Sequence, residues 1–133
     1  VVKGIMSPDD AMAAVDAGAA GIVVSNHGGR QLDGALSTAD ALPAVIDAVA
    51  GRVPVLVDGG IRSGADVIKA LAIGAAAVLV TRPIIWGLVV HGAPGVEAVL
   101  KELAAEMAHA MALCGARTIG DIDRGLIWGM TRR

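Results

Sequence analysis

The chain has 133 residues and a formal net charge of −2 at pH 7, which suits one domain with its own core. Its basic residues are scattered, so we expect no nucleic-acid partner, and its longest apolar stretch, residues 73–80, is too short for a membrane span. A single cysteine excludes an intrachain disulfide and favours a reducing compartment, for which we expect the cytoplasm.

Strand and helix patterns alternate along the chain. Short apolar runs predict strands at residues 1–5, 20–24, 53–57 and 75–80, and each run is followed by a segment with helical periodicity. A repeating strand–helix order predicts that all the strands are parallel, because each helix returns the chain to the same edge of the sheet.

Capping residues mark where the helices begin. Ser7 with Asp10, and Ser63 with Asp66, have the spacing of a capping box. Pro43 either lies in an early turn of the second helix or divides it. The helices are expected at residues 8–18, 38–51, 64–73 and 94–115, with a short helical turn at 84–88 and one further short helix after residue 118.

This order fits half of a (β/α)8 TIM barrel, which needs about 250 residues when complete. We therefore expect residues 1–133 to form one domain of the α/β class that covers roughly four β/α units, with no separate second domain. A doubly wound open sheet is the alternative. Its fingerprint, G-x-G-x-x-G after the first strand, is missing, so the barrel is favoured.

The second predicted strand ends in a polar loop, residues 25–33, with the sequence SNHGGRQLD. Loops at strand ends carry the active sites of alternating strand–helix proteins. Gly28 and Gly29 let a ligand approach the backbone, while His27 offers a titratable base and Arg30 a permanent forked cation. The pair suits an anionic substrate that must lose a proton.

Arginines also follow the third and fourth predicted strands, in the segment 58–62 (DGGIR) and in Thr81-Arg82. Glycine N–H groups, a helix that begins at Ser63 and two guanidinium groups would together stabilise a phosphate. In barrels the loops after the last two strands commonly do so. The alternative is that these glycines only form tight turns and the arginines lie in solvent.

Together these motifs resemble the C-terminal half of the FMN-dependent 2-hydroxy acid oxidases and dehydrogenases, which include glycolate oxidase, lactate oxidase, lactate monooxygenase and mandelate dehydrogenase. The resemblance covers nearly the whole chain, in the family's order. It implies FMN as cofactor, no metal, and oxidation of a small 2-hydroxy acid to the 2-oxo acid, with oxygen or another acceptor taking the electrons. The motifs that carry it are Lys3-Gly4, residues 25–33, residues 58–62 with Gly64, and Arg82-Pro83.

The resemblance also implies roles for individual residues. His27 matches the base that removes a proton while the substrate's hydrogen and electron pair pass to flavin N5, by a carbanion or by hydride transfer. Arg30 matches the residue that binds the substrate carboxylate. Lys3 matches the lysine beside the flavin N1/C2 carbonyl edge, and Ser25 a serine that hydrogen-bonds the flavin. The residues that match the ribityl and phosphate segments are Asp58, Gly59, Gly60, Ile61, Arg62, Thr81 and Arg82.

One position departs from the family pattern. Thr81 stands where the family usually has glycine, so its β-branched side chain is expected to crowd the phosphate.

A half barrel leaves its sheet edges open, so we expect a partner. The family's first four strands have no counterpart in this chain, which lacks tyrosine and begins at Val1, as a truncated or cleaved product would. The expected partner is the missing N-terminal half of the barrel or a second copy, and the resemblance implies a homo-oligomer, a tetramer at full length. One alternative is another FMN- or phosphate-binding barrel, like those of isopentenyl diphosphate isomerase and glutamate synthase, although these lack the 25–33 loop. The other alternative is a catalytically incomplete half barrel that only assembles and binds phosphate.

Overall fold

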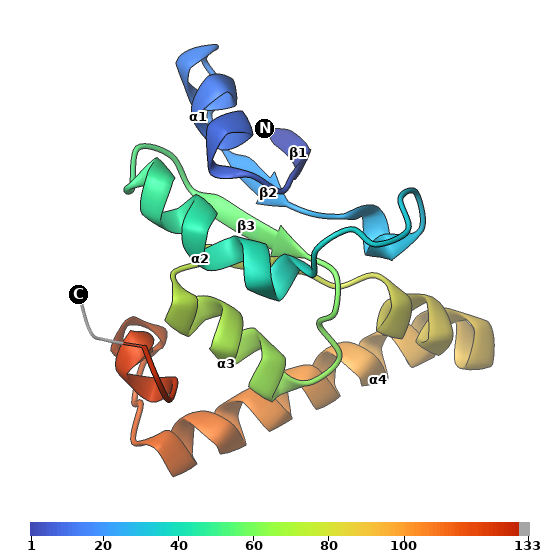
Figure 1. Ribbon diagram of the computed structural model, residues 1–133. Coiled ribbons are helices and arrows are strands. Elements are labelled where there is room, and N and C mark those ends of the chain that lie inside the picture. Colours follow the sequence, from blue (N-terminus) through green and yellow to red (C-terminus); the bar gives the residue numbers. More distant parts are fainter. Residues whose placement is uncertain (131–133) are drawn as a thin grey trace.

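The computed structural model describes residues 1–130, and within them one four-stranded sheet forms the centre of the molecule (Figure 1). The strands follow one another in the order β1-β2-β3-β4, and each neighbouring pair is parallel. The predicted parallel topology is confirmed. The strands are β1 (Val2–Ile5), β2 (Ile22–Val24), β3 (Val55–Asp58) and β4 (Ala77–Leu79).

A helix follows each strand, as predicted, but the C-terminal third differs from the prediction. The expected turn and long helix are joined in α4, whose backbone breaks at His91 and Gly92. Pro43 lies inside α2 without dividing it. The helices are α1 (Pro8–Asp16), α2 (Thr38–Val49), α3 (Gly64–Ile73) and α4 (Arg82–Cys114), and two short 3-10 turns, η2 (Ile119–Asp121) and η3 (Arg124–Leu126), replace the single helix expected after α4.

The two predicted helix caps turn out differently. Ser63 and Asp66 form a reciprocal capping box at the start of α3. At α1 the Ser7 hydroxyl accepts from the Asp10 N–H, but the Asp10 carboxylate accepts from that same hydroxyl at 2.8 Å. The predicted box is therefore only half formed there, because Asp10 is bound by the side chain of the cap and not by its backbone.

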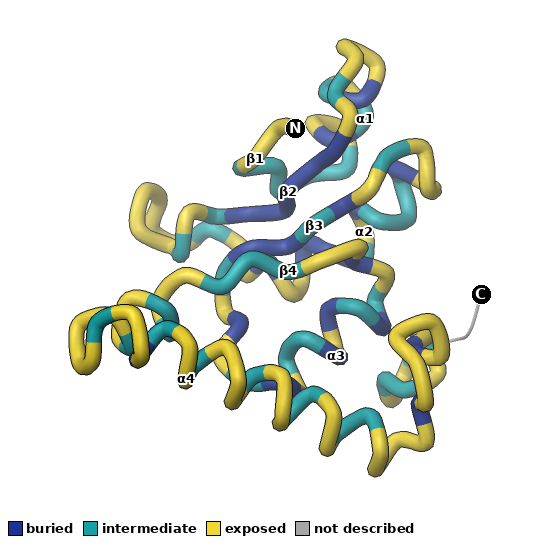
Figure 2. Tube along the Cα trace, turned by 180° about the vertical axis from the view of Figure 1, so that it is seen from behind, coloured by how far each residue is buried: buried dark blue, intermediate teal, exposed yellow. Residues whose placement is uncertain are grey.

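The helices pack against one face of the sheet. Paired residues of parallel strands point to the same side, and Ile22, Val24, Val55 and Val57 all belong to the core cluster that α1 and α2 cover. The row formed by Val23, Leu56 and Ala77 points to the other side. Figure 2, seen from behind, shows that no helix covers this second face. In a barrel it is the face that lines the interior.

Helix α4 is unusual in length and composition. Its 33 residues include an 18-residue window of mean hydropathy 1.4, which by those two measures alone would suffice to cross a membrane. The backbone at His91 and Gly92 departs from helical φ and ψ, and the part of α4 beyond this break packs against α3. The absence of a membrane partner stays a prediction.

Candidate active site

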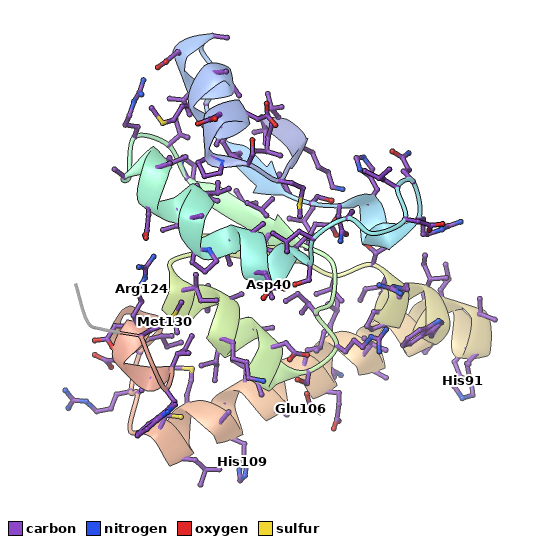
Figure 3. The ribbon with its side chains drawn as sticks, viewed as in Figure 1. Asp40, His91, Glu106, His109, Arg124 and Met130 are labelled. Atoms are coloured by element: carbon purple, nitrogen blue, oxygen red, sulfur yellow. The ribbon has the colours of Figure 1, made fainter. Side chains whose placement is uncertain are left out.

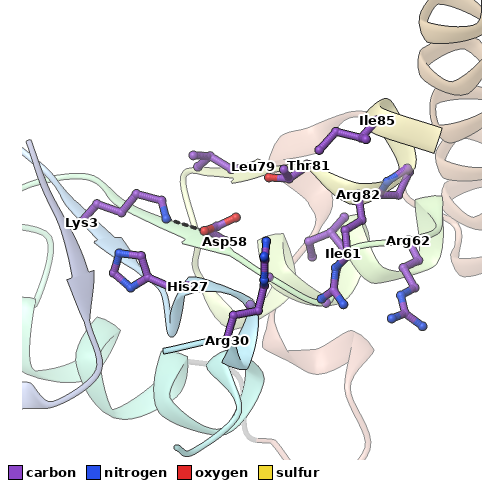
Figure 4. A pocket seen from close by; sticks show the side chains of 14 residues that line it. Lys3, His27, Arg30, Asp58, Ile61, Arg62, Leu79, Thr81, Arg82 and Ile85 are labelled. Atoms are coloured by element: carbon purple, nitrogen blue, oxygen red, sulfur yellow. Dashed lines mark ion pairs between the residues drawn. The ribbon is translucent and has the colours of Figure 1, made fainter. Parts of the chain in front are cut away.

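The carboxyl ends of the strands surround one cavity with a volume of ≈ 260 Å³ (Figure 4). Parallel strands end at the same edge of a sheet, so residues far apart in the sequence meet there. All the predicted site residues except Ser25 line its wall. The lining residues are Lys3, His27, Gly28, Arg30, Asp58, Gly59, Gly60, Ile61, Arg62, Leu79, Thr81, Arg82, Pro83 and Ile85.

Ser25 is buried behind the cavity and links two residues of its wall. Its hydroxyl donates to Asp58 Oδ2 at 2.8 Å and accepts from Lys3 Nζ at 2.9 Å. Lys3 Nζ also forms an ion pair with Asp58 Oδ2 at 2.6 Å, the dashed line in Figure 4. The tips of β1, β2 and β3 are therefore joined by one small polar network.

The network fixes the charge of Asp58. Burial raises the pKa of this carboxyl group, but the hydrogen bonds from Lys3 and Ser25 and the positive charge of Lys3 outweigh that effect, so the pKa of Asp58 lies below its usual 3.8. Asp58 is ionised at neutral pH and holds the Lys3 ammonium group at the mouth of the cavity.

His27 lies three residues after the end of β2 and has a strained backbone conformation. Its φ is +56°, in the left-handed region that few residues other than glycine adopt. Two hydrogen bonds stabilise the turn: the His27 N–H donates to Ser25 Oγ at 3.2 Å, and the Gly29 N–H donates to Asn26 Oδ1 at 3.1 Å. This 3-10 turn, η1 (His27–Gly29), exposes the imidazole to the cavity.

Basic side chains from four segments surround the cavity. Figure 4 shows Lys3 and His27 on one side and Arg62 and Arg82 on the other, with Arg30 between them. A Cβ added at Gly28 would lie 3.9 Å from Arg82 Nη2, so the guanidinium of α4 reaches the loop that carries His27. The only acidic residue among the lining residues is Asp58, whose charge Lys3 already compensates. The cavity therefore favours an anion.

The start of α3 is closed to an anion, contrary to the prediction for the helix that begins at Ser63. Asp66 accepts from the N–H groups of Arg62 and Ser63, and Ser63 Oγ accepts from the Asp66 N–H. Glu106 of α4 takes the next donor, the Gly64 N–H, at 2.6 Å (Figure 3). Arg62 can reach the cavity only with its side chain.

The start of α4 is open. Thr81 precedes this helix and forms no capping hydrogen bond with its side chain, and Pro83 has no N–H of its own. The N–H groups of Arg82 and Ile84 therefore have no side-chain cap at this helix end, which lies beside the Arg82 guanidinium. A helix end of this kind stabilises phosphate groups.

Glycines give the cavity a backbone wall. Gly59 and Gly60 have φ of +99° and +81°, and a Cβ added at Gly60 would have no neighbour within 4 Å. Thr38 Oγ1 of α2 donates to the Gly59 carbonyl at 3.3 Å and ties this loop to the core. Open backbone, an uncapped helix end and guanidinium groups that form no ion pair within residues 1–130 are the donor set that an anionic, phosphate-bearing cofactor requires.

Sequence reasoning missed the residues that shape the site without bearing its chemistry. Leu79 and Ile85 form its apolar side, Thr38 holds the Gly59 loop, and Glu106 holds the start of α3. Helical periodicity gave a signal for Ile85 alone. Glu106 lies 42 residues from its partner Gly64, and no local pattern connects the two.

Comparison with known proteins places the chain in a family. The sequence profile described as "FMN-dependent dehydrogenase" matches residues 1–129. The chain belongs to this family. The FMN-dependent dehydrogenases are enzymes with a TIM-barrel fold and FMN as cofactor, so the half-barrel interpretation of the sheet is confirmed.

Individual members resemble the chain closely. An L-lactate oxidase of Nostoc sp. is 57% identical over 127 residues, which are 96% of this chain and 35% of the relative. The 2-hydroxyacid oxidase 1 of Mus musculus is 55% identical over 127 residues, or 34% of its length. Among solved structures, a mandelate oxidase superposes with a TM-score of 0.88 at 56% identity, covering 92% of this chain and 39% of the other. The chain thus spans about a third of the length of the curated relatives that it matches.

Proposed function

We propose that the chain supplies the base, the carboxylate-binding arginine and the phosphate site for FMN-dependent oxidation of a small 2-hydroxy acid to the 2-oxo acid. The observation that carries the proposal is the shared cavity, in which His27 and Arg30 lie opposite the uncapped start of α4. Relatives named lactate oxidase, 2-hydroxyacid oxidase and mandelate oxidase support the substrate class.

His27 and Arg30 act on the substrate. The planar guanidinium of Arg30 binds the carboxylate through two parallel hydrogen bonds and so orients the hydroxyl-bearing carbon. The imidazole of His27 takes the proton that the acid loses and holds it on a ring nitrogen. FMN, when bound, accepts the hydrogen and electron pair of the substrate.

The remaining residues hold the cofactor. Lys3 brings a positive charge to the isoalloxazine ring, while Asp58 and Ser25 keep its ammonium group in place. The residues around the ribityl chain and phosphate are Gly59, Gly60, Ile61, Arg62, Thr81 and Arg82, of which Arg82 offers both a side chain and a helix end.

The site needs a second wall. Its volume falls below the roughly 300–1,000 Å³ of typical ligand pockets, and no helix covers the sheet face beside it. The first half of α4 also exposes apolar side chains. We propose that the remainder of a barrel, or a second copy of this chain, covers these surfaces in a homo-oligomer located in the cytoplasm. The exposed residues of α4 are Ile85, Trp86, Leu88, Val89 and Val90.

The absorption spectrum of FMN tests the proposal. The chain is mixed with FMN, and spectra are recorded before and after anaerobic addition of lactate, glycolate or mandelate. A perturbed flavin band that bleaches with one acid supports the activity and identifies the substrate. A bound flavin that no acid bleaches favours the second candidate, a half barrel that binds the phosphate without turnover, for which the missing wall is the specific observation.

Two substitutions test the roles of His27 and Arg30, each in the assembly that bleaches. His27→Ala is expected to keep the bound flavin and lose its reduction, whereas His109→Ala, on the exposed side of α4, changes neither.

Arg30→Lys is expected to weaken substrate binding by about 10-fold or more, because an ammonium group cannot form the two-point contact. Unchanged reduction in the first variant, or unchanged affinity in the second, contradicts the assigned role.

A further inference from the structure

Strand β1 contains an extra residue beside the proposed base. Lys3 pairs with Val23 and Ile5 pairs with Val24, so Gly4 has no partner in β2 and forms a bulge. Its φ of +103° is one that residues with a side chain rarely adopt. A bulge next to an active site commonly re-aims a side chain or opens space for one.

The space beside Gly4 is occupied by His27. A Cβ added at Gly4 would lie 3.1 Å from His27 Cε1, 3.9 Å from Nδ1 and 4.0 Å from Nε2, so the edge of the imidazole rests directly on the glycine. A separation of 3.1 Å is tighter than nine in ten Cβ contacts. Any side chain at position 4 would push the ring outward.

His27 has little freedom to yield. Its backbone is in the left-handed region, and its N–H is bound to Ser25 Oγ, which is itself held by Lys3 and Asp58. Because the main chain of His27 is held by these hydrogen bonds, the position of its ring depends on the residue that the ring contacts. That residue is Gly4.

We propose that Gly4 is a positioning residue for His27: the bulge in β1 leaves the gap that the imidazole fills and thereby sets where its nitrogens stand in the cavity. Gly4 is not among the residues that line the cavity, so it acts on the cavity through a residue that does, and the side chain that it meets is His27. The catalytic consequence rests on the proposed function of His27 as base, whereas the contact itself does not.

Gly18 provides a matched control. It also has a positive φ, +91°, but a Cβ added there would have no neighbour within 4 Å. Gly18→Ala therefore introduces the same kind of backbone strain as Gly4→Ala without touching His27. Whatever the two variants share comes from strain, and the difference between them reports the contact.

Nuclear magnetic resonance of the histidine rings tests the contact without any cofactor. In the unsubstituted chain the His27 Cε1 proton should show a nuclear Overhauser effect to the Gly4 α-protons. Gly4→Ala should move the His27 Cε1–H signal and leave those of His91 and His109 in place, and Gly18→Ala should move none of the three. An absent Overhauser effect, or equal shifts in both variants, overturns the proposal.

A double-mutant cycle keeps the proposal testable if Gly4→Ala is poorly folded. We expect Gly4→Ala to lower the melting temperature by about 4 °C more than Gly18→Ala does, and this excess should vanish in the His27→Ala background, where the ring is gone. If Gly4→Ala unfolds the chain, adding His27→Ala should restore folding. An excess loss that persists without the ring means that Gly4 serves only the bulge and refutes the positioning role.

Reduction of bound FMN by the 2-hydroxy acid gives the functional readout. Gly4→Ala should slow reduction by about 10- to 100-fold, because a displacement near 1 Å can reduce a rate about 100-fold, whereas Gly18→Ala should not. A rate unchanged in Gly4→Ala contradicts the proposal. If no acid reduces the flavin in the unsubstituted chain, the proposed function fails, and the resonance data and the cycle still decide the role of Gly4.

Discussion

The chain after β3 and the chain after β4 both carry an arginine beside a helix start, but the two helix starts differ. At α3 the N–H groups of Arg62 and Ser63 are bound by Asp66, that of Gly64 by Glu106, and that of Asp66 by Ser63. At α4 the Thr81 side chain forms no capping hydrogen bond.

The difference shows how one fold uses the positive end of a helix in two ways. At the start of α3 the carboxylates of Asp66 and Glu106 bind the free N–H groups, and Glu106 thereby joins α3 to α4. Where α4 faces the cavity, the same kind of end is left unsatisfied and suits an external anion. Substitutions at α3 should therefore affect stability, and those at α4 should affect ligand affinity.

The largest expected effect is on stability, at Gly64. A Cβ at this position would overlap the backbone nitrogen of Met107 and the carbonyl carbon of Glu106, neither of which can move without shifting α4. Gly64→Ala should lower the free energy of unfolding by about 3 kcal/mol, measured by urea denaturation. Gly120→Ala, whose nearest contact would be Thr118 Oγ1 at 3.6 Å, is the control and should change it by less than about 0.5 kcal/mol. Equal losses would mean that the α3–α4 contact is not tight.

The next effect is on affinity, at Arg82. Arg82→Ala should weaken FMN binding by about 10- to 100-fold, because a hydrogen bond to a charged group contributes about 1.5–3 kcal/mol. Riboflavin, which lacks the phosphate, should bind almost equally to both proteins. Stability should hold or rise slightly, since a cation at a helix N-terminus is unfavourable. Arg52→Ala removes the same charge far from the cavity and is the control. Equal losses of FMN and riboflavin affinity would exclude Arg82 from the phosphate site.

Sequence reasoning predicted the sheet, its parallel order and the polar ends of its strands, because these depend on local patterns, whereas Lys3 and Ser25 were assigned through the family resemblance. Apolar runs, capping residues such as Ser63 and the polar ends of the strands can each be recognised from a few consecutive residues. Ser63 was interpreted correctly as a cap, but the helix end that was expected to help hold a phosphate has its N–H groups bound by Asp66 and Glu106. Nothing near Ser63 in the sequence reveals that Glu106 fills it.

The same limit explains the other differences. The left-handed φ of His27, its contact with Gly4 and the Lys3–Asp58 ion pair all arise where separate strands meet, and tertiary contacts of this kind leave no periodic trace. The length of α4 was underestimated because Gly92 and Pro94 look like the end of one helix and the start of another. The structure keeps both parts together around a local break at His91.

A smaller effect is expected at Glu106. Glu106→Gln keeps an acceptor for the Gly64 N–H but loses its charge, so the free energy of unfolding should fall by about 1 kcal/mol. The ratio of FMN to riboflavin affinity should not change, because the α3 end is not the phosphate site. Glu102→Gln, exposed on the same helix, serves as the control. A higher FMN-to-riboflavin ratio in Glu106→Gln would show that phosphate competes for the α3 start and would remove the contrast between the two helices.

The smallest expected effect is a dependence on pH at Asp66. Burial raises the pKa of this carboxyl group, but the hydrogen bonds from the Arg62 and Ser63 N–H groups and from the Ser63 side chain outweigh it, so the pKa lies below its usual 3.8. A carboxyl whose pKa is lowered by folding contributes stability above its unfolded pKa and loses that contribution as the pH falls through the folded pKa.

The comparison of unsubstituted chain with Asp66→Asn isolates this contribution. The difference in free energy of unfolding should be about 1 kcal/mol or less above pH 5 and should shrink as the pH falls below 3.8. Asp58 and Asp121 also have lowered pKa values, but both are present in each protein, so their contributions cancel. A difference that stays constant with pH would mean that Asp66 caps α3 through its shape alone. The start of α3 would then be closed by Glu106 and the Ser63 hydroxyl, and protonation of Asp66 would not open it.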